Sequence, residues 1–181
     1  MFEILFRITD KTEYLKALNE KSFDNGGDIE GFFAINANGN YYGHYHNNLL
    51  GEDESGWYLI SEWLIDLAVA YQELCKSGYV AINDIESFNT WIEFKKEEEN
   101  LILVSIIKAN KEVGTTEIRL CPFPDFDYGE WKLIPIKKSE YYDELVNKIS
   151  VYINEISEIN SNLLGNKNII KLITLLSKIK K

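Results

Sequence analysis

The sequence predicts an α+β fold: a mainly antiparallel sheet of about six to seven strands, with a long helix packed on one face and further helices at the C-terminus. Two observations lead to this class. Residues 1–136 consist mostly of short apolar runs, separated by turns rich in glycine and asparagine, which is typical of strands. Residues 137–181 repeat apolar side chains every three or four positions, which is typical of helices. Strands followed by helices favour α+β over an alternating α/β arrangement.

The N-terminal part predicts a strand, a short helix and a hairpin. Apolar side chains alternate in residues 2–8, as in a half-buried strand, and residues 11–20 follow as a short polar helix. Residues 31–36 and 40–46 flank Asn38 and Gly39. Both of these residues tolerate the positive φ of a type I′ turn, so the pair predicts a β-hairpin.

The central helix is predicted over residues 57–76. Ser55 is placed to cap its start, and Gly78 follows its end, where a left-handed residue is often needed. The acidic run Glu52, Asp53 and Glu54 precedes it and has two interpretations: stabilisation of the helix dipole, or binding of a cationic partner. Residues at helical spacing form the predicted buried stripe: Ile60, Trp63, Leu64, Leu67, Tyr71 and Leu74.

Four more strands and two helices complete the predicted fold. The strands are expected at residues 79–83, 90–96, 101–108 and 115–120, and the third is apolar on both faces, which favours a central position. All three prolines fall in residues 122–135, and residues 122–131 are predicted as a loop. A long helix is then expected over residues 139–163, broken at Gly165, with a last helix over residues 167–179.

The length and composition predict one folded domain over residues 1–181, strand-rich over 1–136 and helical over 137–181. An apolar fraction of 45% excludes a disordered chain. The N-terminus carries no leader pattern, and no apolar run reaches the roughly 18 residues that span a bilayer. We therefore expect a cytoplasmic protein without membrane contact. Cys75 and Cys121 have no metal or disulfide spacing and are predicted as buried, reduced thiols.

The charge distribution is the most informative feature for function. Residues 22–75 contain no lysine or arginine but nine carboxylates. Residues 1–130 hold 24 acidic and 10 basic side chains, whereas residues 131–181 hold 5 and 9. A long stretch of one sign creates a field that selects cationic partners. Nucleic acid is not expected as a direct ligand, because affinity for phosphate backbones comes mainly from lysine and arginine.

His44 and His46 are the candidates for metal binding. On a strand they would point to the same face, about 7 Å apart, and could share a metal ion with carboxylates. The alternative is a polar strand that faces solvent. The sequence contains no nucleophile motif and no phosphate-binding loop, and no cofactor is predicted.

The loop at residues 122–131 interleaves aromatic and acidic side chains. Aromatic rings are common anchors of protein interfaces, and flanking carboxylates select a cationic partner. In the alternative interpretation the rings fold back over the edge of the sheet while the acids stay in water. The residues concerned are Phe123, Asp125, Phe126, Asp127, Tyr128, Glu130 and Trp131.

One part of the chain resembles a known class of proteins. The run Gly31-Phe-Phe-Ala-Ile-Asn-Ala-Asn-Gly39, the following Gly56-Trp-Tyr-Leu and the helix beginning Trp63-Leu-Ile-Asp-Leu look like small bacterial immunity proteins. Those proteins neutralise polymorphic or contact-dependent toxins in the cytoplasm. The resemblance extends over about residues 31–107 and lies in the layout of hairpin, tryptophan-bearing helix and meander. It implies inhibition of a toxin by binding, and it brings no catalytic residues with it.

The leading functional hypothesis is a non-enzymatic acidic protein that blocks a cationic partner, such as a nuclease-like toxin, by steric and electrostatic occlusion. Other hypotheses are a metal-dependent hydrolase built on His44 and His46, and a structural or small-ligand module with a pocket near Tyr41, Tyr42 and Tyr45. A homodimer through the helix at residues 139–163 is a further possibility. The predicted partner-binding residues are Glu52, Asp53, Glu54, Trp57, Asp125, Phe126, Asp127, Tyr128, Glu130 and Trp131.

Overall fold

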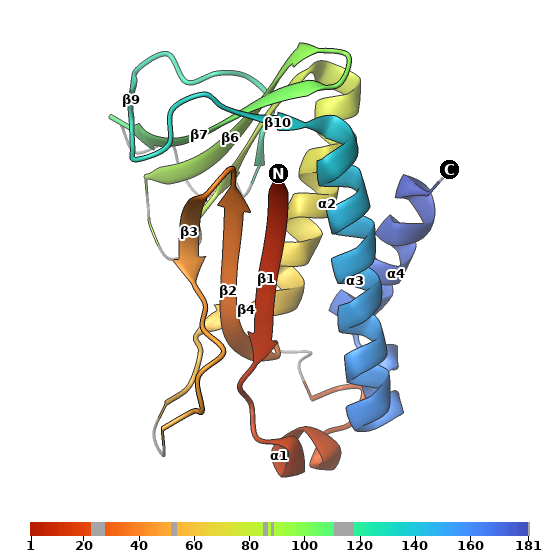
Figure 1. The fold of residues 1–181 in the computed structure, drawn as a ribbon. Coiled ribbons are helices and arrows are strands. Elements are labelled where there is room, and N and C mark those ends of the chain that lie inside the picture. Colours follow the sequence, from red (N-terminus) through yellow and green to blue (C-terminus); the bar gives the residue numbers. More distant parts are fainter. Residues whose placement is uncertain (23–27, 52–53, 85–86, 88, 111–117, 181) are drawn as a thin grey trace. The chain divides into compact units, whose positions relative to one another are not determined.

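A computed structural model describes residues 1–22, 28–51, 54–84, 87, 89–110 and 118–180 of the chain (Figure 1). Its elements, in chain order, are β1 (Phe2–Ile8), α1 (Thr12–Ala17), β2 (Glu30–Ala37), β3 (Asn40–His44), β4 (Tyr58–Leu59), α2 (Ile60–Ser77), β5 (Tyr79–Asn83), β6 (Thr90–Glu98), β7 (Leu101–Ala109), β8 (Ile118–Arg119), β9 (Phe126–Tyr128), β10 (Ile134–Lys137), α3 (Lys138–Asn160), the 3-10 turn η1 (Ser161–Gly165) and α4 (Lys167–Ile179).

The fold is α+β and antiparallel, so the predicted class is confirmed. Within the described residues the strands form two sheets rather than one. The first has four strands in the order β1-β2-β3, with β4 paired to β2, and the second has six in the order β10-β7-β6-β5-β8, with β9 paired to β7. The break falls at α2, because consecutive strands with short connections tend to pair with one another. Strands before α2 pair in one sheet, and strands after it pair in the other.

The chain divides into two compact units. The four-strand unit comprises residues 4–35, 41–68 and 144–181, and the six-strand unit comprises residues 1–3, 36–40 and 69–143. Helix α2 contributes its first nine residues to the former and the rest to the latter, and α3 is also divided. The expectation of a single domain over residues 1–181 stays a prediction.

In the four-strand unit, helices α2 and α3 pack against the sheet. Phe33 of β2 stacks on Trp63 of α2, with ring centroids 5.3 Å apart and planes at 20°. Phe6 of β1 meets Tyr152 of α3 edge-on at 5.6 Å. Figure 1 shows β1, β2 and β3 side by side in this sheet. The long helix on a sheet face is therefore as predicted.

In the six-strand unit, both faces of β6 are covered. Residues two apart on a strand share a face, so Trp91 and Phe94 lie on opposite faces. Phe94 stacks on Tyr141 at the start of α3, with centroids 5.1 Å apart. Trp91 packs against Phe123 of the following loop at 4.9 Å. Strand β7 pairs with both β6 and β10, which places the strand that is apolar on both faces inside the sheet, as expected.

The turn between β2 and β3 has the predicted hairpin geometry. Asn38 and Gly39 have φ of 51° and 87°, the left-handed values that a type I′ turn requires. The side chain of Asn38 donates to the carbonyl of Pro135, and Nδ2 of Asn40 donates to the carbonyl oxygen of Ala37 at 2.9 Å. Side-chain bonds of this kind hold the turn in one conformation.

Helix α2 begins three residues later than predicted, at Ile60, and Ser55 does not cap it. Residues 58 and 59 instead form β4, opposite Gly31 and Glu30 of β2. The cap comes from a distant residue: the carboxylate of Asp28 accepts from the backbone N–H groups of Ser61 at 3.0 Å and Glu62 at 3.2 Å. At the other end, Gly78 has the expected left-handed φ of 76°.

Several local expectations differ from the structure. The helix predicted over residues 11–20 is confined to α1, and part of the loop at residues 122–131 pairs as β9. Of the strand predicted at residues 115–120, the first three residues lie outside the described ones, and β8 covers 118–119. The prediction of buried cysteines is wrong, since Cys75 and Cys121 are both exposed thiols. Cys75 lies one position, about 100° of helix, away from the buried Leu74.

No helix in the described part of the chain is both long and apolar enough to cross a membrane.

Candidate functional site

Trp57 is the most prominent exposed aromatic residue at the predicted interface, with 52% of its surface accessible. Its backbone is fixed by close packing of two glycines. A Cβ atom on Gly56 would overlap the carbonyl group of Gly31, and one on Gly31 would overlap the carbonyl oxygen of Arg7. Glycine is therefore required at both positions for the segment to approach β2. The N–H of Gly56 also donates to Oγ1 of Thr9 at 2.8 Å.

The Trp57 ring lies against His44 at the end of β3. Their ring centroids are 5.7 Å apart and the planes are nearly parallel, at 12°. Trp57 also stacks on Tyr58, with ring centroids 5.5 Å apart. A half-exposed tryptophan that contacts two neighbouring rings has restricted side-chain freedom, so less of it remains to be lost on binding.

His46 and Glu54 continue this arrangement. The centroid of the His46 ring lies 4.6 Å from that of Phe32 and 5.5 Å from that of His44. Its Nε2 lies 2.7 Å from Oε1 of Glu54, whose other oxygen accepts from the N–H of Gly51 at 2.9 Å. The Gly51 N–H and then His46 hold the pKa of Glu54 below its usual value. We refer to His44, His46, Glu54 and Trp57 as the Trp57 cluster.

The fold brings the two histidines that were predicted as metal ligands close together, but the neighbours of their rings are mainly aromatic side chains. The His44 ring contacts both Trp57 and Phe32, and Nε2 of His46 lies next to the carboxylate of Glu54. Within the described residues, no group of three or more His, Cys, Asp or Glu side chains is arranged to hold a metal ion.

Arg7 is a residue of this region that the sequence analysis missed. Its Nη1 donates to the carbonyl oxygens of His46 at 3.2 Å and Asn48 at 2.6 Å. One cation from β1 therefore lies beside the segment that contains no lysine or arginine of its own. Nothing in the local sequence marks Arg7 for this position, because it results from the pairing of β1 with β2.

The loop at residues 122–131 belongs to the six-strand unit and has both buried and exposed aromatic residues. Phe123 and Trp131 are buried, at 4% and 2% exposure. The carbonyl oxygen of Trp131 accepts from the N–H of Ile106 at 3.1 Å. Phe126 is partly buried against the core of this unit, and Tyr128 is 37% exposed with Nζ of Lys132 over its ring at 4.9 Å.

The acidic residues of this loop remain on the surface. Asp125, Asp127 and Glu130 are exposed, and Oδ1 of Asp125 accepts from Nδ2 of Asn110 at 2.9 Å. Phe123 and Trp131 therefore cover the sheet, as the alternative interpretation of the loop had it, while the three acids and Tyr128 face solvent. Trp131 therefore offers no surface to a partner.

The remaining predicted residues are placed as follows. Glu52 and Asp53 lie outside the described residues. Tyr41 is exposed and Tyr42 is half-buried, whereas Tyr45 lines a pocket with residues of β1 and α3. The predicted binding residues thus fall in both units: Glu54 and Trp57 in one, and the loop acids in the other.

Comparison of the chain with protein-family models, with curated proteins and with solved structures gives no match.

Proposed function

We propose that this protein is an inhibitor of the immunity type, which binds a cationic protein partner, such as a nuclease-like toxin, and occludes its basic surface. The observation that carries the proposal is the Trp57 cluster: a half-exposed tryptophan linked through His44 and His46 to an ionised carboxylate, in a segment of 54 residues without lysine or arginine. Tryptophan is enriched among the residues that dominate binding energy at protein interfaces.

The charge supports a partner of opposite sign. The chain carries a formal net charge of −10, and a field of this sign accelerates association with a basic surface. Glu54 is pre-oriented by Gly51 and His46, so it needs no rearrangement to meet a cation. In the six-strand unit Asp125, Asp127 and Glu130 supply a second set of exposed carboxylates.

The mechanism that follows is occlusion rather than chemistry on a substrate. Carboxylates would occupy positions that a basic partner otherwise offers to phosphate groups, and Trp57 would exclude water from the contact. Burial of a tryptophan side chain in such a contact is a large contribution, because these rings bury on the order of 200 Å² of surface.

The test begins with capture of partners by the tagged full-length chain from its native lysate at low and moderate salt, with identification by mass spectrometry. The affinity of the captured basic protein is then measured for wild type and Trp57→Ala. We expect Trp57→Ala to weaken binding about 30-fold, the size of a typical hot spot. Tyr14→Ala, at a tyrosine that is 51% exposed on α1, is the matched control and should change affinity less than about twofold.

Charge variants test the electrostatic part. Glu54→Gln and the triple change of Asp125, Asp127 and Glu130 to their amides should lower the association rate and flatten its salt dependence. Glu99→Gln, at an exposed carboxylate paired with Lys96, is the control. Equal affinity of wild type and Trp57→Ala, or salt-independent association, contradicts the proposal.

A further inference from the structure

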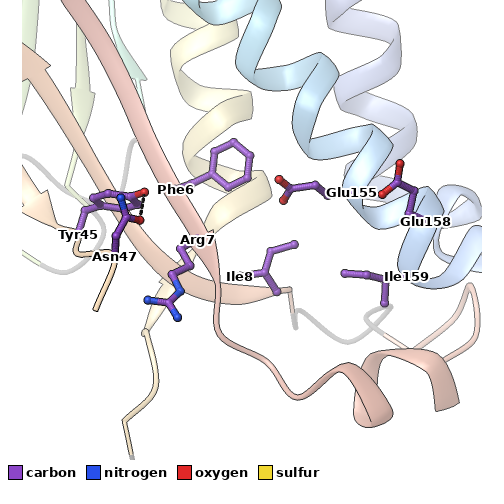
Figure 2. A pocket seen from close by; sticks show the side chains of 8 residues that line it. All are labelled: Phe6, Arg7, Ile8, Tyr45, Asn47, Glu155, Glu158 and Ile159. Atoms are coloured by element: carbon purple, nitrogen blue, oxygen red, sulfur yellow. Dashed lines mark hydrogen bonds between the residues drawn. The ribbon is translucent and has the colours of Figure 1, made fainter. Parts of the chain in front are cut away.

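A pocket in the four-strand unit shares no residue with the Trp57 cluster and borders it through Arg7, which donates to the carbonyl oxygen of His46 (Figure 2). It is a pocket of about 390 Å³ between three segments of the chain. This volume is within the range of small-molecule sites, roughly 300–1,000 Å³. The pocket is lined by Phe6, Arg7 and Ile8 of β1, Tyr45 and Asn47 after β3, and Glu155, Glu158 and Ile159 of α3. We call it the Arg7 pocket.

One end of the Arg7 pocket is acidic. Glu155 and Glu158 lie three residues apart on α3, so they are neighbours on the helix surface. Among the described residues, no lysine or arginine lies within ion-pair distance of either carboxylate. Both side chains are exposed. Local desolvation and the charge of Glu158 raise the pKa of Glu155, and the charge of Lys148 opposes them. A cation entering here would offset the repulsion between the two carboxylates.

The guanidinium of Arg7 does not neutralise these carboxylates. Its Nη1 donates to the carbonyl oxygens of His46 and Asn48, and Figure 2 shows the side chain directed away from Glu155 and Glu158. The backbone acceptors therefore hold Arg7 at the opposite end of the pocket. Because a guanidinium has five N–H donors, it has donors left for a ligand.

The rest of the lining is apolar or neutral. Residues two apart on a strand share a face, so Phe6 and Ile8 lie on one face of β1 and Arg7 lies on the other, and the pocket includes residues from both faces of this edge strand. Phe6, Ile8 and Ile159 are apolar side chains that suit a hydrocarbon stem. The Tyr45 hydroxyl donates to Oδ1 of Asn47 at 2.6 Å, drawn as a dashed line in Figure 2. This bond leaves the Asn47 amide N–H groups and the lone pairs of the tyrosine oxygen for further contacts. The pocket is thus acidic at one end, apolar in the middle and rich in donors at the other.

We propose that the Arg7 pocket binds the cationic side chain of lysine or arginine, with its charged head at Glu155 and Glu158, its aliphatic stem on Phe6, Ile8 and Ile159, and its carbonyl or carboxylate group toward Arg7. Both a free basic amino acid and a basic residue of a bound protein have this chemistry. If the ligand is a basic residue of a bound protein, the inference rests on the proposed inhibitory function; if it is a free amino acid, it does not.

The test is a titration of the isotope-labelled full-length chain with L-lysine and L-arginine, followed by NMR. We expect saturable shifts of the Phe6, Tyr45 and Ile159 signals. L-Norleucine, which has the stem without the charge, should give none. The double variant Glu155→Gln and Glu158→Gln should weaken binding at least tenfold. The control is Glu97→Gln with Glu98→Gln, an equal change of charge at exposed carboxylates of β6.

A second series distinguishes the two sources of the cation. N-Acetyl-lysine amide presents the side chain as a peptide does, so binding of this probe without binding of free lysine identifies a protein residue as the ligand. Binding of free lysine or arginine identifies the amino acid. Absence of saturable binding of all three probes up to about 10 mM overturns the proposal, as does equal binding by the double variant with an unchanged circular dichroism spectrum.

This result is separable from the outcome for the proposed function. Trp57→Ala should leave amino-acid binding at the Arg7 pocket unchanged, because none of the pocket residues belongs to the Trp57 cluster. Tyr45→Phe is an independent variant that keeps the ring and removes the hydroxyl. It should weaken free lysine severalfold and leave the affinity of n-butylamine, which has no carboxylate, unchanged. Equal weakening of both ligands contradicts the proposed orientation.

Discussion

The four-strand and six-strand units each contain a tryptophan beside acidic residues, and the two tryptophans have opposite environments. Trp57 follows Glu54 and is 52% exposed, whereas Trp131 follows Glu130 and is 2% exposed. The reason lies in the backbone on either side. Gly56 packs against Gly31 and leaves Trp57 on the surface, but the carbonyl oxygen of Trp131 is bonded to β7 in the sheet. Local composition does not decide exposure; the partners of the neighbouring backbone do.

The largest expected difference is in stability. Trp131→Ala should lower the free energy of unfolding by about 3–5 kcal/mol, since it removes a fully buried aromatic side chain and leaves a cavity. Urea or guanidinium denaturation followed by circular dichroism measures this loss. A loss below about 1 kcal/mol would mean that Trp131 does not belong to the core of the six-strand unit.

The two termini of α2 provide a second comparison. The C-terminus is capped by Gly78, the next residue in the chain, whereas the N-terminus is capped by Asp28, which is distant in the sequence. Burial raises the pKa of Asp28 to about 6, and bonds from Ser61, Ile29 and Glu62 oppose this only in part. The folded state then holds the Asp28 proton more tightly than the unfolded state, whose pKa is near 3.8. The stabilisation from this proton is complete below about pH 4 and is lost as the pH rises through about 6.

We therefore expect the wild type to lose stability relative to Asp28→Asn as the pH rises. The free energy of unfolding of the wild type minus that of Asp28→Asn should fall by up to about 3 kcal/mol between pH 4 and pH 6, and it should stay constant above pH 6. Denaturant titrations of both proteins at pH 4, 5, 6 and 7 measure it. Asparagine keeps one oxygen acceptor for the helix N–H groups. A difference that rises with pH over this range would show that Asp28 is stabilised as the carboxylate.

Gly56→Ala tests the packing that leaves Trp57 exposed. The added Cβ would overlap the Gly31 backbone, and such overpacking costs about 1–3 kcal/mol. Gly51→Ala is the control, because the nearest atom to its new Cβ is 3.7 Å away. Thermal unfolding measures both variants, and equal melting temperatures would contradict the close approach of residue 56 to β2.

The smallest expected effect on stability is that of Trp57→Ala, below about 1 kcal/mol, since the ring is half exposed and makes its contacts on the surface. The same denaturant titration used for Trp131→Ala measures it. A loss comparable to that of Trp131→Ala would make Trp57 a core residue and would remove the main support for its role in partner binding.

Much of the local structure was predictable from the sequence because its causes are local. The Asn38-Gly39 turn, the left-handed Gly78 and the period of α2 and α3 each depend on residues within a few positions. The start of α2 could not be predicted from the sequence. Its cap is Asp28, which lies 33 residues before Ser61, the residue from whose N–H it accepts a hydrogen bond. The exposure of Cys75 and Cys121 was also misjudged, since an apolar run does not say which of its members face the core.

By itself the sequence determined the α+β class, the hairpin, the approximate positions of the longer helices and strands, and the excess of negative charge. These follow from period, turn chemistry and composition, which are properties of neighbouring residues. Only the tertiary structure decided that the strands form two sheets, that Trp57 is exposed and Trp131 buried, and that Arg7 and Glu155 line one pocket. These features depend on contacts between residues far apart in the chain, and no local pattern encodes which distant backbone a segment will meet.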